Sequence, residues 1–306
     1  MDFGDRGGMG GTKTAVLAGA YCAMTLGCAL WGGSALAGEM EPGGKLLLTG
    51  GVSALEGGAG GGLSTWAVIA GNETSRGVGG KVHATYVNVP DYELRAYGGA
   101  VGLFDRVELS LARQEFDTGA TGAKLGLGKG FTFKQDVVGV KVRVLGDLVY
   151  DQDTWVPQVA VGVQWKKNDQ GAIVRAVGGK DDSGVDYYAA ATKLLLDKSL
   201  LLNGTVRLTK ANQTGLLGFG GDRNDSYRAQ FEGSAGWLVS KRLALGAEYR
   251  TKPDNLGFAK ESDWVDVFAA YAVNKTVSVT VAYVDLGDIA TFKDQRGLYV
   301  SLQAGF

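Results

Sequence analysis

The sequence has few of the residues that bind metals or form disulfides: 2 cysteines and 1 histidine among 306 residues. Both cysteines, Cys22 and Cys28, lie near the N-terminus, so the chain beyond them has no thiol for a disulfide framework. With His83 as the single histidine, a zinc site built from histidines and cysteines is excluded. We expect no metal and no other cofactor.

The chain also lacks long apolar runs after residue 40, whereas a membrane-spanning helix needs ~20 consecutive apolar residues. Helical periodicity is almost absent, and one short candidate covers residues 171–177. Proline is scarce, at 4 residues, whereas glycine is abundant, at 50. The net charge is −1, and the basic residues form no stripe along the sequence. Both observations argue against a nucleic-acid partner.

The N-terminal segment has the features of an export signal. Lys13 precedes an apolar stretch, and Ala35-Leu36-Ala37 has the small-residue form of a signal-peptidase site. We therefore predict a cleaved signal peptide over residues 1–37 and a mature chain over residues 38–306. A single membrane anchor and a lipoprotein attached through Cys28 are the weaker alternatives.

Beyond this segment, apolar and polar residues alternate in stretches of about ten residues, the length that crosses a bilayer as a tilted strand. The segment 202–209, for example, carries Leu, Gly, Val and Leu on one face and Asn, Thr, Arg and Thr on the other. A period of two predicts strands. A soluble antiparallel sandwich would show the same alternation.

Loop lengths separate these two possibilities. Tight connections near 104–106, 197–198, 240–241 and 274–275 alternate with long polar ones near 117–134, 167–184, 210–225, 252–262 and 286–296. Short turns at one rim and long loops at the other are typical of bacterial outer-membrane barrels, with the short turns in the periplasm. We therefore predict an all-β, antiparallel, up-and-down transmembrane barrel in the bacterial outer membrane.

We expect 14 strands. Twelve is the alternative, because the glycine-rich segment 50–62 could fold inward as a plug or lie flat. The expected spans are 46–54, 63–70, 79–89, 92–103, 107–116, 135–147, 154–166, 185–195, 199–210, 226–239, 241–251, 263–273, 276–285 and 296–306.

Aromatic residues lie near the ends of predicted strands, as at the interfaces of membrane barrels. Tyr227, Phe231 and Trp237 share one face of their strand, and Trp155 and Trp165 bracket another. A soluble sandwich would bury such rings in mid-strand, so their placement favours a lipid-facing surface.

The last predicted strand has apolar residues at alternate positions and ends on an aromatic residue. This pattern resembles the C-terminal signal that the outer-membrane assembly machinery recognises. Outer-membrane lipid, lipopolysaccharide and that machinery are therefore the expected partners. The residues that carry the signal are Leu298, Val300, Leu302 and Phe306.

Four short segments resemble the repeated signatures of an uncharacterised family of proteobacterial outer-membrane proteins, DUF3034. They are Phe116-Asp117-Thr118-Gly119, residues 167–172, residues 249–256 and residues 282–287. The resemblance covers nearly all of the mature chain and implies an outer-membrane barrel. It brings no catalytic or ligand-binding residues.

Function is expected to depend on the polar face of each strand, which points into the lumen. We interpret the protein as a channel that passes small solutes through a lumen of mixed charge; a plugged structural or partner-binding barrel is the alternative. The predicted lumen-lining residues are Glu93, Arg95, Glu108, Lys141, Arg143, Arg207, Arg228, Glu232, Glu248 and Arg250.

We expect no enzymatic activity and no catalytic, cofactor-binding or metal-binding residues. A serine–histidine arrangement would have to pair His83 with Ser110 or Ser301, but the spacing selects neither serine. The glycine loop 126–130 lacks the flanking strand and helix of a phosphate-binding loop. The acidic segments 151–153 and 181–184 lack the full ligand spacing of a calcium loop.

Overall fold

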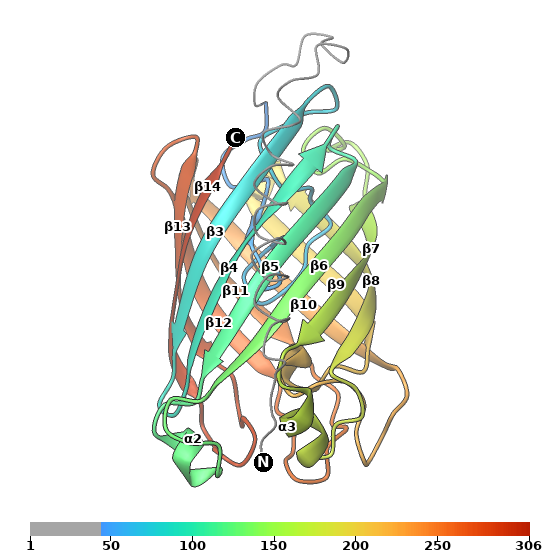
Figure 1. The fold of residues 1–306 in the computed structure, drawn as a ribbon. Coiled ribbons are helices and arrows are strands. Elements are labelled where there is room, and N and C mark those ends of the chain that lie inside the picture. Colours follow the sequence, from blue (N-terminus) through green and yellow to red (C-terminus); the bar gives the residue numbers. More distant parts are fainter. Residues whose placement is uncertain (1–43) are drawn as a thin grey trace, which may run out of the picture. The chain divides into compact units, whose positions relative to one another are not determined.

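The structure is a computed structural model that describes residues 44–306 (Figure 1). The predicted signal peptide, residues 1–37, and its cleavage site lie outside the described residues. The predicted domain 38–306 is described from residue 44 onward.

Twelve antiparallel strands form a closed barrel in which each strand pairs with the next along the chain. The barrel closes between the last strand, β14, and β3, with Leu298 opposite Asn88 and Gly305 opposite Lys81. The fold is therefore the predicted all-β up-and-down barrel (Figure 1). The strands are β3 (Val78–Asn88), β4 (Glu93–Leu103), β5 (Val107–Asp117), β6 (Thr132–Leu145), β7 (Gln158–Asn168), β8 (Ser183–Leu195), β9 (Leu200–Thr209), β10 (Arg228–Ser240), β11 (Leu243–Arg250), β12 (Trp264–Ala272), β13 (Val277–Asp285) and β14 (Arg296–Gly305).

The outward face of the barrel is apolar. On β12 and β13, Val267 and Tyr283 are each 58% exposed and lie opposite one another, whereas Asp266 and Thr280 on the alternate positions are buried. This is the reverse of a soluble protein, whose exposed face is polar. An exposed apolar face on a closed antiparallel barrel belongs in lipid, so the protein is a bacterial outer-membrane barrel.

The expectation of 14 strands is wrong for the wall, which has 12. Residues 46–54 and 63–70 are not wall strands. They belong to an N-terminal segment whose residues 49–71 are all buried. Its two-residue strands, β1 (Val52–Ser53) and β2 (Ala59–Gly60), pair with each other and with no wall strand. A wall strand would expose one face to lipid. This segment has protein on both sides, and it takes the inward-folded course of the 12-strand alternative.

Connections at the two rims differ as predicted, with two exceptions. The turn 88–93 is short although it lies at the long-loop rim, and the connection 145–158 is long although it lies at the short-turn rim. The long loops carry α2 (Thr121–Lys124), α3 (Gly171–Ala176) and the 3₁₀ turn η2 (Asn212–Gly215). A second 3₁₀ turn, η1 (Leu196–Lys198), lies in a short connection at the opposite rim. None of the helices within residues 44–306 is long and apolar enough to span a bilayer.

Candidate functional site in the barrel lumen

We call residues 44–77 the plug; its residues 49–71 are all buried inside the barrel. Its side chains and its backbone contact polar residues from most of the wall strands. The plug has little regular structure of its own, so its buried backbone groups need partners elsewhere, and wall side chains supply many of them. The site is therefore a contact surface between the plug and the wall.

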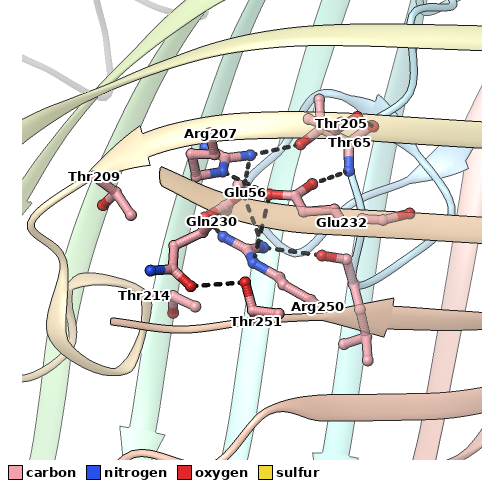
Figure 2. Close-up of polar contacts among 12 residues, drawn as sticks. Glu56, Thr65, Thr205, Arg207, Thr209, Thr214, Gln230, Glu232, Arg250 and Thr251 are labelled. Atoms are coloured by element: carbon pink, nitrogen blue, oxygen red, sulfur yellow. Dashed lines mark hydrogen bonds and ion pairs between the residues drawn. The ribbon is translucent and has the colours of Figure 1, made fainter. Parts of the chain in front are cut away.

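The carboxylate of Glu56 is the centre of this surface (Figure 2). Its oxygens lie 2.6 Å from Lys166 Nζ on β7, 2.9 Å from Arg250 Nη2 on β11 and 3.4 Å from Arg207 Nη2 on β9. All four side chains are almost completely buried. One plug carboxylate thus pairs with cations from three separate strands.

Two further carboxylates, both on the wall, accept hydrogen bonds from the plug backbone. The Leu63 N–H donates to Glu248 Oε2 over 2.8 Å, and the Thr65 N–H donates to Glu232 Oε2 over 2.7 Å. Ser64, between them, donates its hydroxyl to Glu248. Because these contacts are made to backbone atoms, they fix the course of the plug more than they select its side chains.

A third anchor lies on β5 and β6, where Glu108 and Lys141 form a buried ion pair at 3.0 Å. Glu108 accepts the Ala70 N–H over 2.8 Å, and Lys141 donates to the Val68 carbonyl over 2.8 Å and to the Ala59 carbonyl over 3.0 Å. The pair therefore satisfies both donor and acceptor groups of the plug.

Glycine allows the plug to approach these side chains closely. A Cβ atom at Gly61 would lie 1.9 Å from Glu248 Oε1. On the facing wall, a Cβ atom at Gly102 of β4 would lie 2.2 Å from the carbonyl oxygen of Ala70. A side chain at either position would displace the plug or the wall.

Seven of the ten predicted lumen-lining residues are buried inside the barrel. Six of them pair with the plug or with one another, and Arg143 pairs with Asp105 and Asp147 near the short-turn rim. The seven are Glu108, Lys141, Arg143, Arg207, Glu232, Glu248 and Arg250.

The other three are placed differently. Glu93 and Arg95 lie on the outward row of β4, where their side chains are 40% and 52% exposed and pair with each other at 3.1 Å. The prediction for these two residues is wrong because they lie at the strand end, where water solvates outward charges, while Leu94 and Ala96 point inward. Arg228 is the first residue of β10 and is exposed at the rim.

Sequence reasoning missed several members of the site, above all Glu56, Lys166 and Asp186. Lys166 Nζ lies 2.7 Å from Asp186 and both are fully buried. The signal for Lys166 was its position next to the outward-facing Trp165, since neighbouring strand residues face opposite sides. Glu56 had a weaker signal, a lone carboxylate within a glycine-rich segment.

At the short-turn end of the plug, Glu73 lies between the wall and Lys45, whose Nζ is 3.3 Å from Glu73 Oε1. Burial raises the pKa of Glu73 to about 7, against the opposing effect of Lys45. This carboxyl group therefore changes charge near neutral pH, unlike an ordinary glutamate.

His83 points into the barrel from β3, with Nδ1 3.2 Å from Thr85 Oγ1, which in turn lies 2.7 Å from Ser301 Oγ. The acidic segments 151–153 and 181–184 make local contacts: Asp182 pairs with Lys167 at 3.1 Å, and Asp151 accepts the Asp147 N–H. Within residues 44–306, no cluster of three or more acidic, histidine or cysteine side chains is arranged to hold a metal ion.

The side chains proposed as an assembly signal lie on the outward row of β14. Leu298 and Leu302 are 49% and 53% exposed, Val300 is half-buried, and Phe306 is 69% exposed just beyond the strand. The Phe306 backbone pairs with Gly80 of β3 at the closure of the barrel.

The sequence matches the model of a family described as a protein of unknown function, DUF3034, over residues 49–303. The chain belongs to the DUF3034 family. The matched range of this DUF3034 protein takes in most of the plug and all twelve wall strands. A search among curated proteins found no match.

Several solved outer-membrane proteins are similar to the DUF3034 chain in structure. The KdgM porin and the NanC porin each have a TM-score of 0.48 at 11% identity, and the alignments cover 74% of this chain and 99% and 98% of theirs. The COG4313 outer membrane channel from Pseudomonas putida F1 has a TM-score of 0.45 at 12% identity, covering 75% of this chain and 95% of that one.

Proposed function

We propose that this DUF3034 protein is an outer-membrane channel for small solutes whose resting lumen is closed by the plug. Passage then requires the plug to shift, because residues 49–71 are buried and fill the space between the walls. The observation that carries the proposal is the polar character of the contact between plug and wall.

That contact consists largely of hydrogen bonds and ion pairs, such as those of Glu56, Glu248 and Lys141. Water can replace such partners one for one, so the free energy needed to separate polar surfaces is smaller than for an apolar core of equal area. Once the plug shifts, the same charged side chains border a wet lumen and act on passing ions and solutes.

The decisive experiment locks the plug to the wall. Ala67 of the plug packs with Ala160 of β7 and Ala190 of β8 in a small buried cluster. The double substitution Ala67→Cys and Ala190→Cys, made in a signal-processed chain, introduces one candidate disulfide, to be verified by mass spectrometry. Conductance in planar bilayers and swelling of liposomes with small sugars and ions are then measured before and after reduction.

We expect wild-type protein to conduct in discrete steps, the oxidised variant to be silent, and reductant to restore conductance. The single variant Ala190→Cys is the matched control and should conduct in both states. Equal conductance of the oxidised and reduced double variant would show that solutes pass without plug movement.

The alternative function is a permanently plugged barrel that binds a partner through its long loops. It is favoured by the number of buried ion pairs, because the plug would then be part of the fold. Silence of the wild-type and the reduced variant under all voltages, together with conductance of a chain from which residues 47–71 are deleted, would support this alternative.

We also propose that β14 is the segment bound by the outer-membrane assembly machinery. The outward positions of Leu298, Leu302 and Phe306 support this role. Phe306→Ser should reduce the amount of folded protein in the outer membrane without lowering the stability of the barrel once it is folded. Wild-type membrane levels would contradict the proposal.

A further inference from the structure

A cavity of about 250 Å³ lies at the long-loop rim, separate from the polar contact between plug and wall. Six connections and the inward faces of the nearby strand ends contribute to it. By the rule for bacterial barrels, this rim faces the outside of the cell. The side chains that line it come from Tyr92 in the turn 88–93, Leu127 in the loop 117–132, Ile173 in α3, Leu216 after η2 and Ile289 in the loop 285–296, among others.

The lining is almost entirely apolar and rich in rings. Tyr92, Phe116, Phe133, Phe258 and Trp264 all contribute to it. The Tyr92 and Phe116 rings pack with centroids 4.8 Å apart, so part of this aromatic wall is already ordered. Loop ends at the outside of a barrel are ordinarily polar, and a concave apolar surface there is typical of a ligand site.

One polar atom in this wall has no partner. Trp264, at the start of β12, is only 4% exposed, and none of residues 44–306 accepts a hydrogen bond from its Nε1. A buried indole N–H usually has a partner, because an unmade hydrogen bond costs about 1–3 kcal/mol.

The ring of Trp264 is held in place by cations, with Lys252 Nζ 4.8 Å and Arg250 Cζ 5.9 Å from its centroid. The three other polar side chains in the lining already have partners. The Tyr92 hydroxyl donates to the Ile289 carbonyl over 3.4 Å. Gln213 accepts a hydrogen bond from Lys252, and the Thr118 hydroxyl donates to the Phe131 carbonyl. Among the side chains that line this cavity, the Trp264 N–H is therefore the donor that lacks a partner within residues 44–306.

We propose that this cavity binds a compact apolar ring compound that carries one hydrogen-bond acceptor, such as an aromatic ketone. An engineered apolar cavity of about 150 Å³ holds benzene, so a cavity of about 250 Å³ suits a larger ring system. The aromatic lining packs against flat rings better than against a flexible chain. Binding here does not depend on plug movement, so the inference stands apart from the proposed channel function.

The test uses full-length mature protein in lipid nanodiscs and isothermal titration calorimetry, with empty nanodiscs as the blank. The probes are 2-acetylnaphthalene, 2-ethylnaphthalene, which has the same shape without the carbonyl, and decan-2-one, which has the carbonyl on a flexible chain. The variants are Trp264→Phe, which keeps a ring but removes the N–H, and Leu125→Trp, which fills the cavity from a half-buried loop position.

We expect Trp264→Phe to weaken binding of the naphthyl ketone by about 2- to 12-fold, the value of one hydrogen bond, and to leave 2-ethylnaphthalene unchanged. Leu125→Trp should weaken both by roughly tenfold or more, as loss of about 1.4 kcal/mol of contact would do. Trp155→Phe is the control, since Trp155 is 85% exposed in the connection 145–158 at the other rim, and it should bind like wild type.

Equal binding by wild type and Leu125→Trp would mean that the probes dissolve in lipid, and it would overturn the site. An equal loss of both naphthyl probes in Trp264→Phe would overturn the role of the N–H. Tighter binding of decan-2-one than of the naphthyl ketone would overturn the preference for a ring.

Discussion

Single carboxylates decide how firmly the lumen is closed. Glu56 contacts three buried cations, and Glu248 and Glu232 each accept a backbone N–H of the plug. Charges that look like the lining of a pore in the sequence thus act as anchors in the resting structure. In the proposed channel, the same residues would meet solutes only when the plug is displaced.

Glu56→Gln should loosen the plug without unfolding the barrel. The substitution leaves Lys166, Arg207 and Arg250 with less compensating charge, and breaking a buried ion pair costs about 3–5 kcal/mol. Because Asp186 and Glu232 still pair with these cations, we expect the lower end, about 3 kcal/mol, which speeds amide exchange of residues 52–70 by roughly a hundredfold.

Hydrogen exchange with mass spectrometry measures this effect, with the β13 amides as an internal standard. Glu93→Gln is the matched control, because Glu93 is an outward, exposed carboxylate that pairs only near the rim. Unchanged exchange in the Glu56 variant would show that the plug is held by its other contacts.

Glu73 should make the stability of the plugged barrel depend on pH. Its folded-state pKa is raised from 4.5 to about 7, so the folded protein binds this proton more tightly than the unfolded chain does. Stability is therefore highest when Glu73 is protonated, and this contribution is lost as pH rises from 4.5 to about 7.

In Glu73→Gln the loss disappears: the variant should match wild type at pH 5 and exceed it at pH 8. Urea unfolding in lipid vesicles at both pH values measures the difference. Asp105 also pairs with Lys45, at 2.8 Å. If the pH dependence persists in the Glu73 variant, Glu73 is not its source.

Among the strands, β4 shows how the inward and outward side chains differ in size. The inward row contains Gly98, Ala100 and Gly102, small residues that leave room for the plug, and the outward row carries Tyr97 and Val101, which are 42% and 36% exposed. The small residues on the inward row of β4 are therefore consistent with a lumen that contains the plug.

Gly102→Ala should destabilise the plugged state, because the new Cβ would lie 2.1 Å from Glu73 Oε1 and 2.2 Å from the Ala70 carbonyl oxygen. Overpacking of this kind costs about 1–3 kcal/mol. Gly204→Ala on β9 is the control, since nothing lies within 4 Å of its added Cβ. Urea unfolding in vesicles compares the two, and equal stability would show that the wall adjusts.

For the whole molecule, the exposed apolar side chains on the outer face of the barrel determine that it lies in lipid. Val267, near the middle of β12, and Val273, just beyond its end, are 58% and 46% exposed. Arginine on a lipid-facing strand costs about 2–4 kcal/mol at the bilayer midplane and about 0–1 near the interface.

Val267→Arg should therefore lower the free energy of unfolding in lipid vesicles by about 2–4 kcal/mol, and Val273→Arg should lower it by about 0–1 kcal/mol. Both are measured by reversible urea titration. Equal effects at the two positions would mean that the apolar band is not centred where the strand register places it.

Much of the fold follows from local pattern. The segment predicted over 107–116 is observed at Val107–Asp117, and the one over 276–285 at Val277–Asp285. Alternation identifies strands because neighbouring residues face opposite environments, and this holds without knowledge of the partner strand. It assigns a face wrongly at a strand end, where water solvates outward charges, as for Glu93 and Arg95 of β4.

The sequence by itself determined the twelve wall strands, their antiparallel order and the apolar exterior, because each depends on residues close together in the chain. It did not separate them from residues 46–54 and 63–70, which fold inward. The tertiary structure decided what fills the lumen. Glu56 and Arg250 are 194 positions apart, and whether their charges meet depends on the closure of the whole barrel. The attraction between two charges falls with distance and rises with burial, and neither quantity can be read from spacing along the chain.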